Sequence, residues 1–320
     1  MILWIYIILV PIDMGTQFDS VILQGIDYSY EEKYEMAKNS FNQAIVIKPD
    51  DPAPYFLIAS LYGMYMVDFS TDSMERELFA YSDTAVMIAT RKIEAKDSSA
   101  LLHLWLAGGY GVRAFYQVWN KKIIQGIQDG VKSIKEFYKT IEQDSSIYDA
   151  YLGTAGYRYF QYKLLSIIPG LANSNWESEL KMAINEGKYF KIPALTTYAL
   201  LLIEEKRYKE AVKIATQLIE EFPDSRTFRW IRVKSYSGMK DWKQAKLEYE
   251  KLLDLTLTGQ QNSFYNIGYC RLGLAKTYFN LGEQVKCINQ CNEIIKNLPD
   301  TPKIKDLKTD AQKLIKKIDK

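Results

Sequence analysis

One spacing of small, apolar and proline residues recurs along this chain and limits its fold more than any other feature. In the stretch Ala37, Phe41, Ala44, Pro49, the later residues follow the first at offsets of 4, 7 and 12. Offsets of 4 and 7 share one side of an α-helix, and proline cannot continue a helix. The sequence therefore predicts the same helix several times, since the offsets recur, once with a final leucine, in Ala211, Ala215, Leu218, Pro223; Cys287, Cys291, Ile294, Pro299; and Ala245, Tyr249, Leu252, Leu257.

A second pattern accompanies the first and predicts a partner helix. Its residues lie at offsets of 3, 4 and 7, with a small residue third and an aromatic residue last. A small residue lets a neighbouring helix approach closely, and a ring fills the space that remains. We therefore expect an all-α chain of antiparallel helix pairs, because the pattern occurs as Tyr55, Ile58, Ala59, Tyr62; His103, Leu106, Ala107, Tyr110; and Arg271, Leu274, Ala275, Tyr278.

These two stripes resemble the tetratricopeptide repeat (TPR) family. Its first helix carries a large–large–small–aromatic stripe and its second a small–aromatic–small stripe closed by proline. The resemblance covers most of residues 18–300 and implies a TPR-like α-solenoid, but it specifies no ligand. Three stretches also resemble parts of poorly characterised bacterial TPR proteins: Asp51–Leu57, Tyr110–Tyr116 and Pro223–Trp230. That likeness implies a bacterial source, and the periplasm or cell envelope rather than the cytoplasm.

The length of the repeat changes along the chain. Ala211 and Ala245 are 34 residues apart, which is the usual TPR length, whereas Ala37, Ala85 and Ser133 are separated by 48 residues each. We therefore expect enlarged helical hairpins in the N-terminal half. The spacing indicates six helix pairs, and a seventh only if the poorly matched middle of the chain also forms one.

Composition along the chain suggests how these pairs are organised. Pro169 and Gly170 among small polar residues predict a loop and hinge, and the Lys-rich end predicts a basic capping helix. A single continuous superhelix is the alternative to two subdomains. The expected organisation is an apolar segment over residues 1–17, enlarged hairpins over 18–168 and a hinge over 169–178. Ordinary TPR repeats over 179–300 and a cap over 301–320 follow.

The apolar run Ile2–Val10 has two interpretations that the sequence leaves open. Its nine residues are too few to span a membrane, which requires about 20. The run resembles the hydrophobic centre of a secretory signal, although no Lys or Arg precedes it and no small-x-small cleavage site follows. It is therefore either a signal or anchor segment, or an N-terminal helix packed on the core. Membrane association is expected only through this segment.

Few residues are available for catalysis or metal binding. His103 is the one histidine of the sequence, and Cys270, Cys287 and Cys291 are its three cysteines. A zinc site needs three or four such ligands in close register, and a triad could use only His103. We expect a packing histidine and core thiols, with a catalytic or pH-sensing histidine and a disulfide or metal as the alternatives. The sequence thus predicts no enzyme, no cofactor and no metal.

The candidate binding residues come from projecting the first helix of each pair, which lines the concave face of a TPR stack. In the N-terminal half this face is apolar or small, and in the C-terminal half it is partly basic. The arginines at 226, 229 and 232 form one stripe, which favours an acidic partner unless nearby carboxylates balance it. The predicted groove residues are Phe56, Ser60, Leu104, Trp105, Gly108, Trp230, Arg229, Arg232, Lys234, Arg271 and Lys276.

The leading hypothesis for function is a non-catalytic scaffold or adaptor that binds a peptide segment or partner protein in this groove. A net charge of +2 gives no field that would draw the chain to nucleic acid. The first alternative is a structural subunit of a bacterial envelope assembly, with its groove filled by its own chain or by an assembly partner. The second is a small-molecule binder or enzyme in the insertions around residues 63–84 or 160–180.

Overall fold

The computed structural model describes residues 14–97, 99–165, 175–259 and 263–318. The predictions for residues 1–13, including Ile2–Val10, and for residues 169–174 of the expected hinge lie outside these ranges. Within them the chain is entirely α-helical, with fifteen helices: α1 Met14–Tyr30, α2 Tyr34–Ile47, α3 Pro52–Phe69, α4 Glu75–Glu94, α5 Ala100–Trp119, α6 Ile123–Gln143, α7 Ala150–Leu165, α8 Trp176–Glu186, α9 Lys191–Glu204, α10 Tyr208–Glu221, α11 Arg226–Gly238, α12 Trp242–Thr258, α13 Phe264–Asn280, α14 Gln284–Asn297 and α15 Pro302–Ile318.

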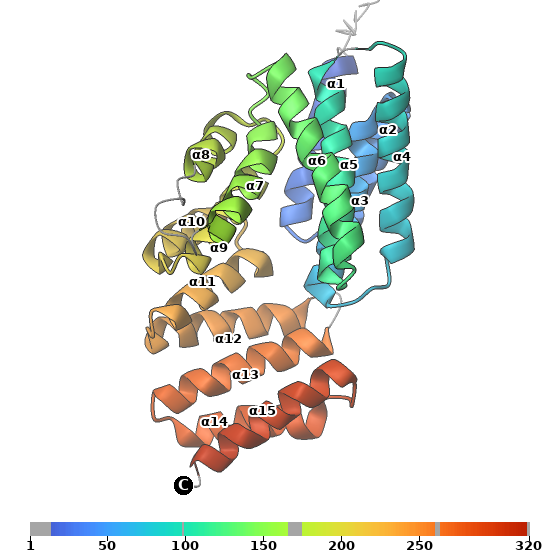
Figure 1. Cartoon of the computed structure of the whole chain (residues 1–320). Coiled ribbons are helices and arrows are strands. Elements are labelled where there is room, and N and C mark those ends of the chain that lie inside the picture. Colours follow the sequence, from blue (N-terminus) through green and yellow to red (C-terminus); the bar gives the residue numbers. More distant parts are fainter. Residues whose placement is uncertain (1–13, 98, 166–174, 260–262, 319–320) are drawn as a thin grey trace, which may run out of the picture.

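Consecutive helices pack as antiparallel pairs, which confirms the predicted TPR-like solenoid (Figure 1). Helices α3 to α6 have 18 to 21 residues and α9 and α10 have 14, so the N-terminal hairpins are enlarged as expected. The middle of the chain does form a pair, α7 with α8, and the described residues therefore contain seven pairs followed by the capping helix α15. Helix α8 includes the last three residues of the expected hinge segment.

The small–aromatic stripes form the core in the way the spacing predicted. Ala37 and Ala44 of α2 are fully buried, and Phe41 between them is 1% exposed. Its ring lies over Gly25 of α1, where an added Cβ would come within 2.4 Å of the ring. Tyr249 of α12 covers Gly273 of α13 in the same manner, at 2.3 Å. A ring on one helix and a glycine on its neighbour thus allow the close approach that the repeat requires.

Helix ends follow local sequence signals. Asp51 caps α3 by accepting a hydrogen bond at 2.9 Å from the backbone N–H of Ala53, and Pro52 occupies the first helical position. Several turns within pairs contain a non-glycine residue with positive φ, among them Glu32 at 60° and Ser70 at 53°. Both of these residues come from the N-terminal half and contact the C-terminal repeats.

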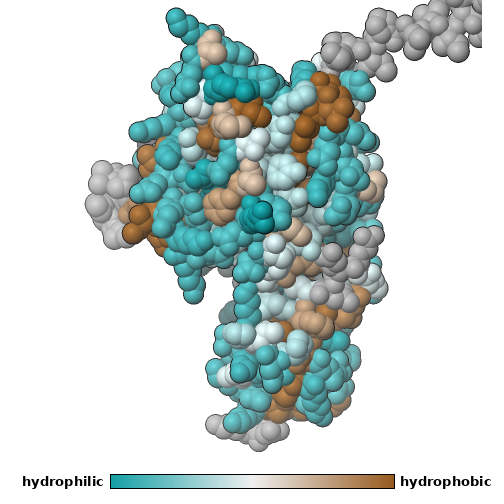
Figure 2. Space-filling view, turned by 90° about the vertical axis from the view of Figure 1, so that its right-hand side faces the viewer, coloured by the Kyte–Doolittle hydropathy of each residue, from teal (hydrophilic) through white to brown (hydrophobic). Residues whose placement is uncertain are grey.

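The stack curls so that its N-terminal and C-terminal halves meet. The ring of Tyr30, at the end of α1, stacks on Phe228 of α11 at 5.7 Å and lies 6.3 Å from Phe222. Seen from the right of Figure 1, the surface is largely hydrophilic with separate apolar areas (Figure 2). None of the helices in the described ranges is long and apolar enough to cross a membrane.

Candidate functional site

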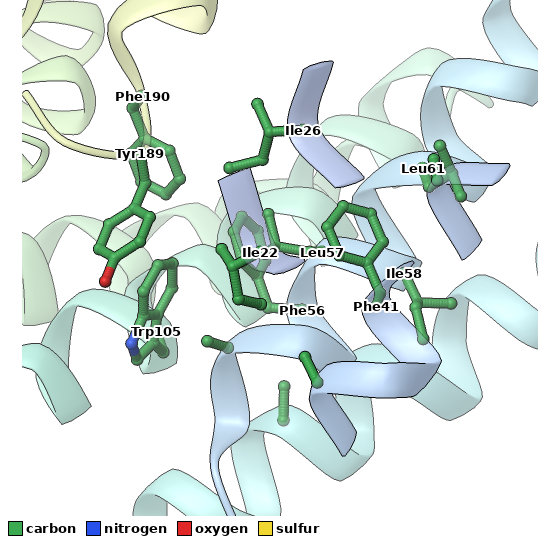
Figure 3. Close-up of a cluster of buried hydrophobic side chains, with 14 of the residues drawn as sticks. Ile22, Ile26, Phe41, Phe56, Leu57, Ile58, Leu61, Trp105, Tyr189 and Phe190 are labelled. Atoms are coloured by element: carbon green, nitrogen blue, oxygen red, sulfur yellow. The ribbon is translucent and has the colours of Figure 1, made fainter. Parts of the chain in front are cut away.

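The predicted N-terminal groove residues lie together, but the chain itself covers them. Phe56 and Trp105 are 8% and 4% exposed, and their rings are 5.9 Å apart. Tyr189 and Phe190, from the loop between α8 and α9, pack against Trp105 at 5.1 and 5.9 Å (Figure 3). Phe190 also contacts Phe56 at 5.9 Å. Two rings from a distant loop therefore occupy the concave face where an apolar anchor of a partner was expected.

The other predicted residues of this face are also inside the molecule or beside the cluster. Leu104 is fully buried, and Ser60 is half-buried. Gly108 lies under Phe56, whose ring would be 2.8 Å from a Cβ added there. These positions therefore serve the packing of α3 on α5 in this structure.

A buried aspartate holds the covering loop in place. Asp149 is 3% exposed and accepts hydrogen bonds from three consecutive backbone N–H groups, those of Lys188 at 3.1 Å, Tyr189 at 2.8 Å and Phe190 at 2.6 Å. The hydroxyl of Tyr189 donates to Asp19 of α1 at 3.0 Å. The loop is thus tied both to the start of α7 and to the N-terminal helix.

The predicted arginines of the C-terminal half are paired within the solenoid. Arg229 and Arg232 both contact Glu248 of α12, at 3.4 and 2.5 Å, and Glu248 is 7% exposed. Arg271 donates to Gln290 at 2.8 Å and lies 3.3 Å from Glu293. Each of these arginines therefore has a carboxylate partner within the repeats, as the alternative interpretation of the arginine stripe expected, although Arg229 and Arg232 share the one charge of Glu248.

Arg226 forms a buried ion-pair cluster with Glu32 and Asp68, here called the clasp. Its Nε is 2.6 Å from Glu32 and its Nη2 contacts Asp68. All three side chains are 8–9% exposed. Glu32 also accepts from the backbone N–H groups of Arg226 and Thr227, at 2.7 and 3.0 Å, so it caps the N-terminus of α11. Tyr34 donates to Asp68 at 2.9 Å.

Beyond the clasp, the end of α3 also contacts the N-termini of α13 and of the capping helix α15. Ser263, at the cap of α13, donates to the carbonyl of Phe69 at 2.9 Å, and Asn266 donates to the carbonyl of Asp68. Lys303 of α15 donates to the carbonyl of Ser70 at 3.0 Å. The C-terminal repeats therefore bind a short segment of the N-terminal half through a carboxylate and three carbonyl oxygens.

The clasp predicts a pH dependence of stability. It contains two carboxylates and one guanidinium, and burial, followed by the charge of Glu32, raises the pKa of Asp68 to about 7. Between its ordinary value of 3.8 and this raised value, the folded chain holds a proton on Asp68 that the unfolded chain releases. The contribution of Asp68 to the free energy of unfolding should consequently fall as pH rises from about 4 to about 7. Urea titrations across this range should show that wild type loses stability relative to Asp68→Asn as pH rises; a constant difference between the two would contradict the prediction.

Another part of the surface of the C-terminal repeats is exposed, on α11 and α13. It carries three aromatic residues in a row across α11 and α13: Trp230 lies 5.3 Å from Tyr269, which stacks on Tyr265 at 6.1 Å. Tyr269 is 42% exposed. Lys234 and Lys276, both predicted groove residues, are exposed on the same two helices and have no carboxylate partner among the described residues.

Lys276 also borders a cavity of about 390 Å³ between α11, α12, α13 and α15. The lining of the cavity is mixed. Trp242, Tyr249 and Leu314 supply aromatic and apolar side chains, and Lys317 supplies a basic one. We call the open region with this cavity the C-terminal concave surface, defined by Trp230, Lys234, Tyr265, Tyr269, Lys276 and Lys317.

The three cysteines and the histidine are the residues that were considered for catalysis or metal binding. Among the described side chains, no group of three or more His, Cys, Asp and Glu residues is placed to hold a metal ion. Cys270, Cys287 and Cys291 are free and buried, and burial raises the pKa of Cys270 and Cys291 to about 12. Such thiols stay protonated at neutral pH and are poor nucleophiles. His103 is 5% exposed, with Nδ1 2.5 Å from Glu136.

Several residues that shape the site were absent from the predicted set. Tyr265 and Tyr269 could have been found, since they lie on the same side of α13 as Lys276, eleven and seven residues earlier. Asp149, Tyr189 and Phe190 carry no local signal, because their role depends on which helices the loop meets in space.

Comparison with known proteins agrees with the repeat architecture. Residues 194–225 match the tetratricopeptide repeat family model. A TPR repeat-containing protein from Cytophaga hutchinsonii, solved as its C-terminal part, has a TM-score of 0.46 and 16% identity, over 92% of this chain and 99% of its own. A tetratricopeptide repeat protein from Parabacteroides merdae gives 0.43 and 15%, over 93% and 100%. At these identities the likeness concerns the fold alone. A search of curated proteins gave no match.

Proposed function

We propose that this tetratricopeptide repeat protein is a non-catalytic scaffold that binds an acidic, aromatic-containing peptide segment of another protein on its C-terminal concave surface. TPR domains typically mediate protein or peptide binding. The N-terminal face is left out of this binding region, because Tyr189 and Phe190 pack there against Trp105 and Phe56.

The arrangement of aromatic and basic side chains beside the Asp68–Ser70 segment supports this proposal. At one end of the C-terminal repeats, the chain's own Asp68–Ser70 segment is held through a carboxylate and backbone carbonyls. Next to it, the row Trp230, Tyr269 and Tyr265 presents aromatic faces. The lysines at 234, 276 and 317 lie beyond, without carboxylate partners in the described part of the chain. Aromatic anchors with unpaired cations suit an extended segment that combines carboxylates with a ring or apolar side chain.

The proposal is tested with fluorescein-labelled peptides and the full chain, read by fluorescence anisotropy. A peptide of alternating Glu and Phe should bind, and its affinity should fall as salt rises, whereas a Lys–Phe peptide should bind much more weakly. Trp230→Ala and Lys276→Glu should each weaken binding by about tenfold or more, which corresponds to about 1.4 kcal/mol.

Lys213→Glu provides a matched control, because Lys213 is an exposed lysine on α10, the second helix of its pair. This variant should bind like wild type. Equal binding of the acidic and basic peptides, or an unchanged affinity in Trp230→Ala, would rule the proposal out.

A further inference from the structure

The fully buried residues of helix α6 are small or polar: Gly126, Asp129, Ser133 and Thr140. The other long helices bury mainly alanine, leucine, isoleucine or aromatic side chains, and α6 adds only partly buried apolar residues such as Phe137 and Ile141 to the core. Asp129 accepts hydrogen bonds from Arg113 and Gln117 of α5, both at 3.1 Å, and Ser133 donates to the carbonyl of Ala107 at 2.8 Å. Rotating α6 to bury its isoleucines would break these bonds, so the polar contacts fix its orientation.

The consequence is a large exposed apolar surface on the α5–α6 hairpin. Ile124 and Ile127 are 72% and 59% exposed, far more than an apolar side chain in a packed helix pair. The stacked rings of Phe115 and Trp119 extend the surface onto the end of α5. We call this the α6 apolar face, made of seven residues that are all 47% or more exposed: Phe115, Val118, Trp119, Ile123, Ile124, Ile127 and Val131. Contiguous apolar exposure of this kind is typical of an interaction site.

Helix α7 borders this face without covering it. The two helices touch where Phe137 of α6 lies over Gly153 of α7, and an added Cβ on Gly153 would be 2.2 Å from that ring. Tyr157 and Phe160 follow on the same side of α7, one and two turns later, and are 37% and 59% exposed. Both helices therefore carry exposed apolar side chains within a few turns of this contact.

Two exposed lysines near the α6 apolar face favour an acidic partner segment over a second copy of this chain. Lys121 and Lys135 are exposed, lie seven residues before and after Gln128, and have no carboxylate partner among the described residues. Gln128 is close to the centre of the exposed isoleucine stripe. In a two-fold antiparallel contact between two copies, Lys121 of one would face Lys135 of the other, and like charges disfavour that pairing. A segment with carboxylates on both sides of its apolar stripe would instead pair with both lysines.

We infer that the α6 apolar face is a second docking surface, which takes an amphipathic helix of a partner protein whose apolar stripe is flanked by acidic residues. It is separate from the C-terminal concave surface and recognises a helix rather than an extended segment. The anchors are Ile124, Ile127 and Val131, and the two lysines fix the charge preference.

The experiment uses two labelled synthetic helices of about 18 residues with the same leucine stripe, flanked by glutamates in one and by lysines in the other. With the full chain, the glutamate-flanked helix should bind about tenfold or more tightly than the lysine-flanked helix. Ile127→Asp should weaken the binding of both. The double variant K121E/K135E should reverse the preference between them, a result that packing alone cannot produce.

Two control variants locate the effect. Val285 of α14 is 73% exposed, so Val285→Asp adds the same charge at an aliphatic position that is at least as exposed as Ile127, and it should leave binding unchanged. Trp230→Ala should also leave it unchanged, so that loss of the peptide site and loss of the helix site can be told apart. Circular dichroism and urea titration confirm that each variant is folded.

Several outcomes would overturn the inference. Equal affinity for the two helices, or an unchanged affinity in Ile127→Asp, would remove the docking surface or its charge preference. A wild-type dimer in sedimentation equilibrium that Ile127→Asp dissociates would assign the face to a second copy of this chain. Binding to phosphatidylglycerol vesicles that Ile127→Asp abolishes would assign it to a membrane surface.

Discussion

Replacing Arg226 by alanine is expected to lower the free energy of unfolding by about 3–5 kcal/mol. The reason is that Glu32 and Asp68, both 8% exposed, would be left as two buried carboxylates without a cation. The end of α3 would also lose its attachment to α11, which joins the two halves of the chain. Urea denaturation followed by far-ultraviolet circular dichroism measures the loss.

Two further variants separate buried charge from lost packing. Arg207 makes similar contacts with Glu177 and Glu210, but its side chain is 34% exposed, so Arg207→Ala should cost about 1 kcal/mol or less. The triple variant E32Q/D68N/R226M removes the charges together and should recover part of the stability lost in Arg226→Ala. If Arg226→Ala and Arg207→Ala cost the same, the clasp is not a buried ion-pair cluster of the kind described.

Asp149→Ala is expected to cost about 3–6 kcal/mol, because three backbone N–H groups of the loop between α8 and α9 would lose their acceptor together. With the loop released, Tyr189 and Phe190 should leave Trp105, so that the apolar face of the N-terminal half becomes accessible. Urea denaturation should register the loss of stability, and binding of an apolar dye should rise.

Asp149→Asn is the matched variant, since its amide oxygen can still accept from part of the loop and should retain a substantial share of the stability. Asp19→Ala removes only the contacts of the loop with α1, where the Asp19 side chain is 35% exposed, and should cost much less. A dye signal that stays at the wild-type level in Asp149→Ala would show that the loop is held by its rings rather than by the carboxylate.

The helices and their pairing could be predicted from the sequence because their signals are local. The stripe of Ala37, Phe41 and Ala44 fixes which side of α2 is buried, and Pro49 limits its length. The 48-residue steps predicted the enlarged hairpins for the same reason, since repeat length depends only on spacing along the chain. Even α7, whose stripe is broken by Arg158, pairs with α8; there Arg158 contacts Glu179.

The surroundings of the candidate groove residues were harder to predict, because projecting a helix face shows direction but not what lies opposite. Phe56 and Trp105 do point to the concave side, yet that side is filled by a loop some 85 residues or more further along the chain. Arg229 and Arg232 form the expected stripe, yet both pair with Glu248 of the next helix. Lys234 and Lys276 are the predicted basic residues that remain exposed and unpaired in the described structure.

The sequence by itself determined the repeating helices, their pairing and the two repeat lengths, since each depends on residues within a few turns of one another. The tertiary structure alone decided which concave surfaces are open, because that depends on how far the superhelix curls. The contacts that close it join Glu32 to Arg226 and Asp19 to Tyr189, across 194 and 170 residues. The tertiary structure also decided that the isoleucines of the α6 apolar face are exposed. Their amphipathic pattern alone favours burial, but Asp129 and Ser133 hold the opposite side of the helix against α5.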